Sequence, residues 1–197
     1  DVCSSDLATI SNQGIADLKT LTASNNAYTI TVATTEVAAA DLKAVDAATS
    51  INVNAAAVTQ ITGAAADVLD VYNGGFAGLG NEAVVLSGET SVANANAVDE
   101  KTEAVVTATI ADKAIGALIA LTGVGNAYTI NVETASVDAA DLNALDAKTT
   151  VTLNANAVTT LTGAAAAIET AIKADTINTA AGVAVTITGD RKSTRLN

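Results

Sequence analysis

The chain repeats itself after 100 residues, and this internal repeat limits the possible folds more than any other feature. Residues 8–32 (ATISNQGIADLKTLTASNNAYTITV) align without gaps with residues 108–132 (ATIADKAIGALIALTGVGNAYTINV), and the same register continues to residue 66. The sequence therefore predicts two related blocks, residues 8–107 and a shorter second block at residues 108–189.

Short runs of β-branched residues recur in both blocks and predict strands, because their composition and length are typical of strands. Their spacing is about 22 residues, with a longer gap of about 33 residues after the third run of each block. The runs are ATI (8–10), YTITV (28–32), SINVN (50–54), AVVLS (83–87), VVTATI (105–110), YTINV (128–132), TVTLN (150–154) and VAVTIT (183–188).

Between these runs the apolar spacing becomes helical. Val158, Leu161, Ala165, Ile168 and Ile172 step by three and four residues, which predicts one face of a helix. The same step relates Ile15 to Leu18 and Ile115 to Leu118.

Polar residues indicate where the helices start. Ser136 precedes VDAADLNAL and predicts a helix start, and Asp138 in the first turn favours the helix dipole. Thr35 occupies the corresponding place in the first block.

A strand and a short helix of this size cannot bury their own apolar faces, so neighbouring units must stack. We therefore expect an α/β repeat solenoid of about eight strand-helix coils, with a parallel sheet on one side and short Ala-rich helices on the other, as in leucine-rich repeats. Asn54 and Asn154 follow strands and are either plain turn residues or members of an asparagine ladder between coils. Open edge strands at the ends of such a stack predict end-to-end self-association.

Composition excludes several classes of function. The net charge of -12 disfavours nucleic acid and anionic membrane surfaces as partners, and no apolar run is long enough for membrane insertion. The chain has no His, Pro, Met or Trp and only 2% aromatic residues, so its core must consist of Ala, Val, Leu and Ile.

The two ends differ from the rest of the chain. Residues 1–7 (DVCSSDL) and 190–197 (DRKSTRLN) contain the lone Cys3 and both arginines, Arg191 and Arg195. When back-translated, the two stretches are reverse complements over most of their length, as a short-read sequencing adapter read at both ends of one insert would be. We interpret both as adapter-derived and exclude them from functional reasoning.

Paired carboxylates are the candidates for chemistry, since His and native Cys are absent. Asp67 with Asp70, and Asp138 with Asp141, each share a predicted helix face, but Asp67 and Asp138 have alanine as their equivalent in the other block. We interpret these pairs as solvated acidic faces. The aspartates that do recur, Asp41 with Asp141 and Asp46 with Asp146, are expected to be helix-surface and helix-end positions.

The glycines are expected to be structural. Gly63 and Gly163 precede alanine runs without the Gly-Lys-Ser/Thr sequence of a phosphate loop, which favours a bend or a close packing contact. Glycines 74, 75, 78 and 80 are predicted to form a longer loop in the first 33-residue gap, and any binding specificity would lie in such variable loops.

Three stretches carry a resemblance to a known kind of protein: GLGNEAVVLS (78–87), VDAADLNALDAKTT (137–150) and NANAVTTLTGAAAAI (154–168). They resemble the Ala/Thr/Val-rich acidic repeats of very large bacterial proteins of marine and cyanobacterial type. The resemblance implies a surface or secreted, adhesin-like role. The calcium-binding nonapeptide GGxGxD, which some of these proteins carry, is absent.

The sequence therefore predicts a structural repeat segment, a spacer or stalk of a large extracellular or cell-surface bacterial protein. We expect no enzymatic activity, no catalytic, cofactor-binding or metal-ligating residues, and neighbouring repeats of the parent chain as partners. The alternative is an adhesive module that binds a glycan or depends on Ca²⁺. An enzyme built on the solenoid is disfavoured, because acid clusters and basic subsite residues are missing.

Overall fold

The computed structural model describes residues 8–22 and 26–189, so both stretches interpreted as adapter sequence lie outside the described residues. The described residues form seven helices and a set of short strands that pair in parallel. The predicted α/β class with parallel strands is confirmed. The chain divides into two compact units, Asp1–Ala108 and Thr109–Asn197, which we describe separately.

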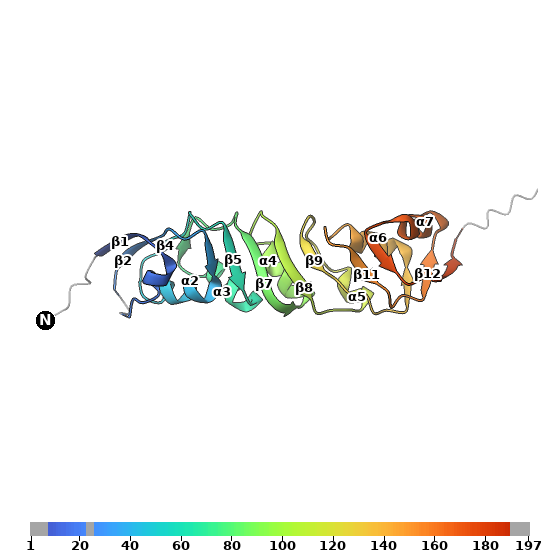
Figure 1. The fold of residues 1–197 in the computed structure, drawn as a ribbon, viewed down its shortest axis with the longest axis horizontal. Coiled ribbons are helices and arrows are strands. Elements are labelled where there is room, and N and C mark those ends of the chain that lie inside the picture. Colours follow the sequence, from blue (N-terminus) through green and yellow to red (C-terminus); the bar gives the residue numbers. More distant parts are fainter. Residues whose placement is uncertain (1–7, 23–25, 190–197) are drawn as a thin grey trace, which may run out of the picture. The chain divides into compact units, whose positions relative to one another are not determined.

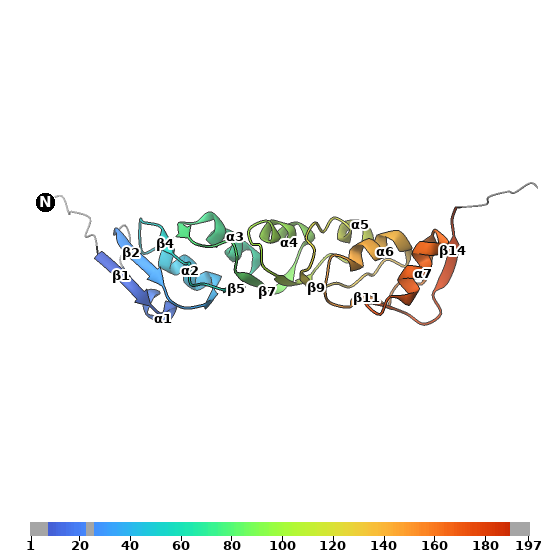
Figure 2. The same cartoon turned by 90° about the horizontal axis from the view of Figure 1, so that it is seen from above.

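In unit 1, most helices are preceded and followed by a short strand. The helices α2 and α3 lie side by side in both views (Figure 1 and Figure 2). The elements are β1 (Ala8–Gln13), α1 (Ile15–Leu18), β2 (Tyr28–Val32), β3 (Glu36–Ala38), α2 (Ala39–Asp46), β4 (Val53–Asn54), β5 (Gln60–Gly63), α3 (Ala65–Asn73), β6 (Phe76–Ala77), β7 (Ala83–Thr90), α4 (Val92–Asp99) and the start of β8 (Val106–Ile110).

The strands before and after the helices of unit 1 belong to different sheets. β3, β5 and β7 pair in that order, whereas β1, β2, β4 and β6 form a second sheet. Glu36 pairs with Gln60, and Gln60 pairs with Ala83, so each step along the first sheet advances the chain by nearly the same length. The expectation of a single sheet is wrong. The strand that follows α2, Val53–Asn54, pairs with β6 in the second sheet and not with the strands that precede the helices.

Unit 2 repeats this order of elements. β10, β12 and β14 form one sheet, β11 and β13 form another, and α6 and α7 are neighbours (Figure 2). Its elements are α5 (Ile115–Leu118), β9 (Ala127–Thr129), β10 (Ser136–Asp138), α6 (Ala139–Asp146), β11 (Leu153–Ala155), β12 (Thr160–Gly163), α7 (Ala165–Lys173), β13 (Ile177–Thr179) and β14 (Ala184–Ile187).

The predicted strands all contain part of an observed strand. β2 has the predicted bounds, and β1, β7, β8 and β14 overlap their runs closely, but only the last two residues of SINVN are extended, as β4. The long gaps after residues 54 and 154 are not loops. In the first gap, β5, α3 and β6 continue the same alternation, and Phe76 and Ala77 in β6 interrupt the predicted glycine loop.

The helix predicted from Val158 onwards is wrong in its first half. Leu161 lies in β12, and the helix α7 starts only at Ala165. Gly163 has a φ of 126°, which a right-handed helix cannot contain. The alternation of burial across Thr160–Gly163 is that of a strand, so the step from Val158 to Leu161 matched helical spacing by coincidence.

The predicted helix starts are also displaced. Ser136 is the first residue of β10, and α6 begins at Ala139. Asp138 is the N-cap residue, and its Oδ1 accepts a hydrogen bond of 2.8 Å from the backbone N–H of Ala140. Thr35 precedes β3, where its backbone oxygen accepts hydrogen bonds from the N–H groups of Thr59 and Gln60.

The core consists mainly of small aliphatic side chains, as composition predicts. Ala39, Ala55, Ala139 and Ala155 are fully buried among Val, Leu and Ile, and Tyr128 is the one aromatic side chain described as fully buried. None of the described helices is long and apolar enough to cross a bilayer.

Two glycines give opposite predictions for stability. Gly78 has a φ of +89°, and a Cβ there would lie 2.8 Å from the Cα of Ala56, whereas a Cβ at Gly116 in α5 would meet nothing within 4 Å. Gly78→Ala should lower the free energy of unfolding by more than about 1 kcal/mol, and Gly116→Ala should raise it by about 0.5–1 kcal/mol. Urea unfolding followed by far-ultraviolet circular dichroism should place the two midpoints on opposite sides of the wild type. A Gly78→Ala midpoint at or above the wild type would contradict the loop geometry.

Candidate functional site

The most enclosed charged group among the described residues is the carboxylate of Glu82, which lies directly before β7 and is 1% exposed. Its Oε1 accepts a hydrogen bond from the hydroxyl of Tyr72 on α3. Its Oε2 accepts hydrogen bonds from the backbone N–H groups of Gly80 at 2.8 Å and Asn81 at 3.1 Å. The backbone oxygen of Glu82 accepts a further bond of 2.6 Å from the hydroxyl of Thr102.

The same contacts keep Tyr72 protonated. Burial raises the pKa of the Tyr72 hydroxyl well above its ordinary value, and the hydrogen bond to the negative Glu82 carboxylate raises it further. The tyrosine is therefore a hydrogen-bond donor to Glu82 throughout the physiological range and is not available as a base.

The Glu82 cluster is suited to holding the backbone rather than binding a ligand. Both carboxylate oxygens have donors, because Gly80 N–H also lies 3.1 Å from Oε1. A buried carboxylate satisfied in this way fixes the glycine-rich turn at residues 78–81 against α3. Sequence reasoning missed Glu82; the available signal was a single charged residue directly before an apolar strand.

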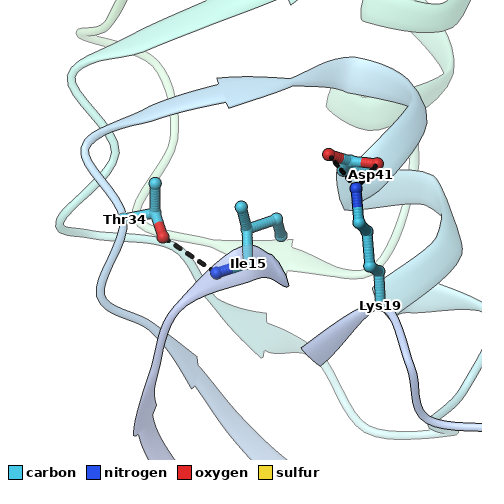
Figure 3. Close-up of polar contacts among 4 residues, drawn as sticks. All are labelled: Ile15, Lys19, Thr34 and Asp41. Carbon is cyan, nitrogen blue, oxygen red and sulfur yellow. Dashed lines mark hydrogen bonds and ion pairs between the residues drawn. The ribbon is translucent and has the colours of Figure 1, made fainter. Parts of the chain in front are cut away.

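Lysine–aspartate ion pairs connect neighbouring helices of unit 1. Lys19 Nζ, just after α1, lies 3.1 Å from Asp41 Oδ2 on α2 (Figure 3). Beside it, the backbone N–H of Ile15 donates to the hydroxyl of Thr34 at 2.9 Å (Figure 3). The Thr34 bond recurs in unit 2, where Ile115 donates to Thr134 at 2.9 Å.

The predicted pair Asp67 and Asp70 does come together, on one lysine. Lys43 Nζ on α2 lies 2.7 Å from Asp67 Oδ1 and 2.7 Å from Asp70 Oδ2, both on α3. Hydrogen bonds to Asp67, and then to Asp70, raise the pKa of Lys43. The two carboxylates are 40% and 62% exposed, as expected of a solvated acidic face, and they also form a contact between helices.

At the equivalent place in unit 2, Asn143 replaces the lysine, and its Nδ2 donates to the backbone oxygen of Ala167 at 2.9 Å. The second predicted pair, Asp138 with Asp141, is not joined by a common partner, because Asp138 caps its own helix.

The recurring helix-end aspartates lie against the turn that follows the next helix along the chain, as expected of helix-end positions. In unit 2, Asp146 Oδ2 accepts a hydrogen bond of 2.7 Å from the hydroxyl of Thr176. In unit 1, a Cβ at Gly75 would lie 2.7 Å from Asp46 Oδ1, which explains why this position has no side chain.

The predicted packing role of Gly63 and Gly163 is confirmed. A Cβ at Gly63 would lie 3.1 Å from the Cβ of Ala39, and a Cβ at Gly163 would lie 2.9 Å from Asp138 Oδ1. Both glycines let a strand approach the start of the preceding helix.

Asn54 and Asn154 are exposed and close the turn that follows them. Asn54 Oδ1 accepts from the N–H of Ala56 at 3.1 Å, and Asn154 Oδ1 accepts from the N–H of Asn156 at 3.3 Å. Asn154 also bonds to the adjacent parallel segment, since its Nδ2 donates to Asn131 Oδ1 at 2.8 Å. The turn role is therefore found at both positions and a ladder contact at one.

Asn154 belongs to a regular array on the outer face of unit 2. Residues 129–131, 152–154 and 176–178 each read Thr-x-Asn, with the central Ile or Leu buried and the threonines exposed. Asn131 is paired with Asn154, and Asn154 with Asn178, in adjacent parallel segments. Three asparagines thus lie in register on adjacent parallel segments, whose usual spacing is about 4.8 Å, and each has a threonine two residues before it.

Among the residues that the structure describes, no group of three or more His, Cys, Asp or Glu side chains is placed to hold a metal ion. A scan against protein-family models, a search of curated proteins and a search of solved structures each gave no significant match.

Removing the charge of Glu82 should destabilise the fold. Glu82→Gln directs an amide N–H₂ at groups that donate hydrogen bonds, so the free energy of unfolding should fall by about 2–3 kcal/mol. Glu89→Gln, an exposed change in β7, is the matched control and should shift stability by less than about 0.5 kcal/mol. Equal effects of the two changes in urea unfolding would rule out that the Glu82 carboxylate fixes the turn at residues 78–81.

Tyr72→Phe should reveal the raised tyrosine pKa. The folded-state pKa lies above the ordinary value of 10.0, so the stability gained from Tyr72 is complete below pH 10 and is lost as the pH rises above it. The difference in unfolding free energy between wild type and Tyr72→Phe should therefore be constant from pH 7 to 9 and shrink above pH 10. A difference that grows with pH would contradict the Glu82 contact.

Proposed function

We propose that the chain is a structural repeat segment, an α/β solenoid that acts as a spacer or stalk within a large extracellular or cell-surface bacterial protein and has no chemistry of its own. The observation that supports the proposal is the similar length of chain between paired segments, from 20 residues between Ala8 and Tyr28 to 24 residues between Glu36 and Gln60. Thr59 bonds to the backbone oxygen of Thr35, and Thr159 to that of Ala135, each 24 residues apart.

The parallel registers support the same step. In unit 2, Ser136 pairs with Thr160, and Thr160 with Ala184. In unit 1, the step from β4 to β6 and the step from β5 to β7 are one residue shorter, at 23. In a solenoid, each repeat adds one coil and buries its apolar face only against the coils beside it. Steps of 23 and 24 residues between paired strands are what such a chain would give.

The polar side chains support a structural role. Neighbouring helices are joined by the side chains of Lys19, Lys43 and Asn143. Backbone oxygens of the preceding coil accept hydrogen bonds from the hydroxyls of Thr49 and Thr149. The carboxylate of Glu82 holds a turn. These polar side chains are therefore engaged in contacts within the fold, which supports a spacer role.

The extracellular assignment rests on the resemblance of the repeats and on the acidic composition. Neighbouring repeats of the same parent chain are the proposed partners, and strand edges that no described residue covers offer a route to end-to-end association.

A second candidate is favoured by the Thr-x-Asn array of unit 2. Uncharged hydroxyl and amide groups can donate and accept hydrogen bonds with the hydroxyls of a neutral glycan. The three triplets contain no lysine or carboxylate, and among these described residues only the Thr176 hydroxyl is bonded to a carboxylate, that of Asp146. In unit 1 the third coil has Gly75 and Ala77 at the equivalent positions, so its array is incomplete. An adhesive role would therefore lie in unit 2.

Deleting exactly one coil tests the solenoid. Removal of Glu36–Thr59 joins Thr35 to Gln60, which already pairs with Glu36 and so takes its place in the register. This variant should keep the helix and strand content of the wild type and unfold cooperatively with a lower midpoint, because one coil interface is lost. The measurement is far-ultraviolet circular dichroism with urea unfolding.

The matched control removes half a step, Glu36–Ala47, which would put Ala48 in the place of Glu36 and reverse the order of helix and strand. This variant should fail to fold. If both deletions fold equally well, or both fail, the solenoid proposal is wrong.

The glycan proposal is tested by retention on insoluble cellulose, chitin and agarose. Asn154→Asp removes an exposed amide donor at the centre of the array, and Asn54→Asp makes the same change at the equivalent position of unit 1. Retention on at least one polysaccharide should fall several-fold for Asn154→Asp only. Absence of retention of the wild type on all three would end this candidate.

A further inference from the structure

The strand β14 leaves core-type side chains exposed. Val185 and Ile187 are 46% and 62% exposed, although Val185 is paired with Leu161, which is fully buried. β14 pairs with β12 on one edge, and no described residue pairs with its other edge. This second edge is the outer edge of β14.

The equivalent strand of block 1 shows what covers such an edge. Ile61 and Leu161 are equivalent in the repeat and pair with Val84 and Val185, so β7 and β14 correspond. Val84 is fully buried and Leu86 is 6% exposed. The next coil provides this burial, and the N–H of Val84 donates to the backbone oxygen of Val105 at 3.1 Å.

The hydrogen-bonding direction of β14 matches that of β7. The N–H of Ala83 donates to Thr59 and the N–H of Ala184 donates to Thr159, both towards the preceding strand. Because successive N–H groups of a strand point to opposite edges, Val185 N–H faces the outer edge as Val84 N–H faces Val105. Gly88 and Gly189, which follow the two strands, both have positive φ, at 72° and 91°.

We propose that the outer edge of β14 is an acceptor site for a further coil of this repeat, with a strand like Val105–Ala108 and a helix like α4 (Val92–Asp99). The proposal rests on the proposed function and names the contact through which the next repeat is joined. The partner is specified by shape and pairing: buried Val92, Ala95 and Val98 on its helix, and buried Val106 and Ala108 on its strand.

The test supplies this coil from the chain itself. A variant in which Glu89–Ile110 follows Gly189 in place of residues 190–197 should raise the thermal midpoint by more than about 4 °C over the wild type. In hydrogen exchange, the amides of Val185 and Ile187 should gain protection at least tenfold, while those of Ala184 and Thr188, which already face β12, should change little.

Two controls separate docking from a general effect of added chain. The same addition with Val98→Asp and Val106→Asp in the added copy should give neither the midpoint shift nor the protection. Val185→Pro removes the outer N–H without touching the bonds to β12, so it should leave the original chain nearly unchanged and abolish the gain of the extended chain.

The outcomes distinguish the two proposals. If deletion of Glu36–Thr59 is tolerated but the added coil leaves Val185 and Ile187 unprotected, the acceptor site is wrong and the solenoid stands. If the deletion is not tolerated, the solenoid is wrong. Protection by the added coil then still supports pairing at the outer edge as a local property of β14.

Discussion

The parallel pairing of short strands that are distant in the sequence is the interaction on which the rest of the structure depends. Most strands have two to five residues and the helices are short, too little for one strand and one helix to enclose a core. Pairing supplies both the backbone hydrogen bonds and the apolar contacts, so burial of Ile61, for example, requires Val37 on one side and Val84 on the other. Local structure and packing are therefore a single cooperative step.

Small side chains make this arrangement geometrically possible. Ala39 and Ala139 start their helices fully buried, and glycine at 63 and 163 removes the remaining bulk where the next strand passes. A larger residue at either place would push the helix away from the strand and open a void between them. The scarcity of aromatic residues fits this close packing, and Tyr128 is the one aromatic side chain described as fully buried.

The α/β class and most long β-branched strands could be predicted from the sequence, because two apolar periodicities alternate clearly there. The strands β3, β5, β10 and β12 could not, because three or four residues such as Glu36–Ala38 have no periodicity of their own and become extended only by pairing. The contact of Lys43 with Asp67 and Asp70 could be predicted only in part. The two carboxylates share a helix face in the sequence pattern, but their lysine lies 24 and 27 residues away in the chain. Glu82 was missed because nothing local marks a carboxylate whose partners are backbone N–H groups.

The difference between Lys43 and Asn143 gives the two blocks different sensitivities to their solvent. Dissolved salt screens the exposed ion pairs of Lys19 and Lys43, and the screening length falls from about 10 Å at 0.1 M to about 3 Å at 1 M salt. The bond from Asn143 to the backbone of Ala167 joins two uncharged groups and is not weakened in this way. At equivalent sequence positions, neighbouring helices are thus joined by a contact that high salt weakens in unit 1 and by one that high salt does not weaken in this way in unit 2.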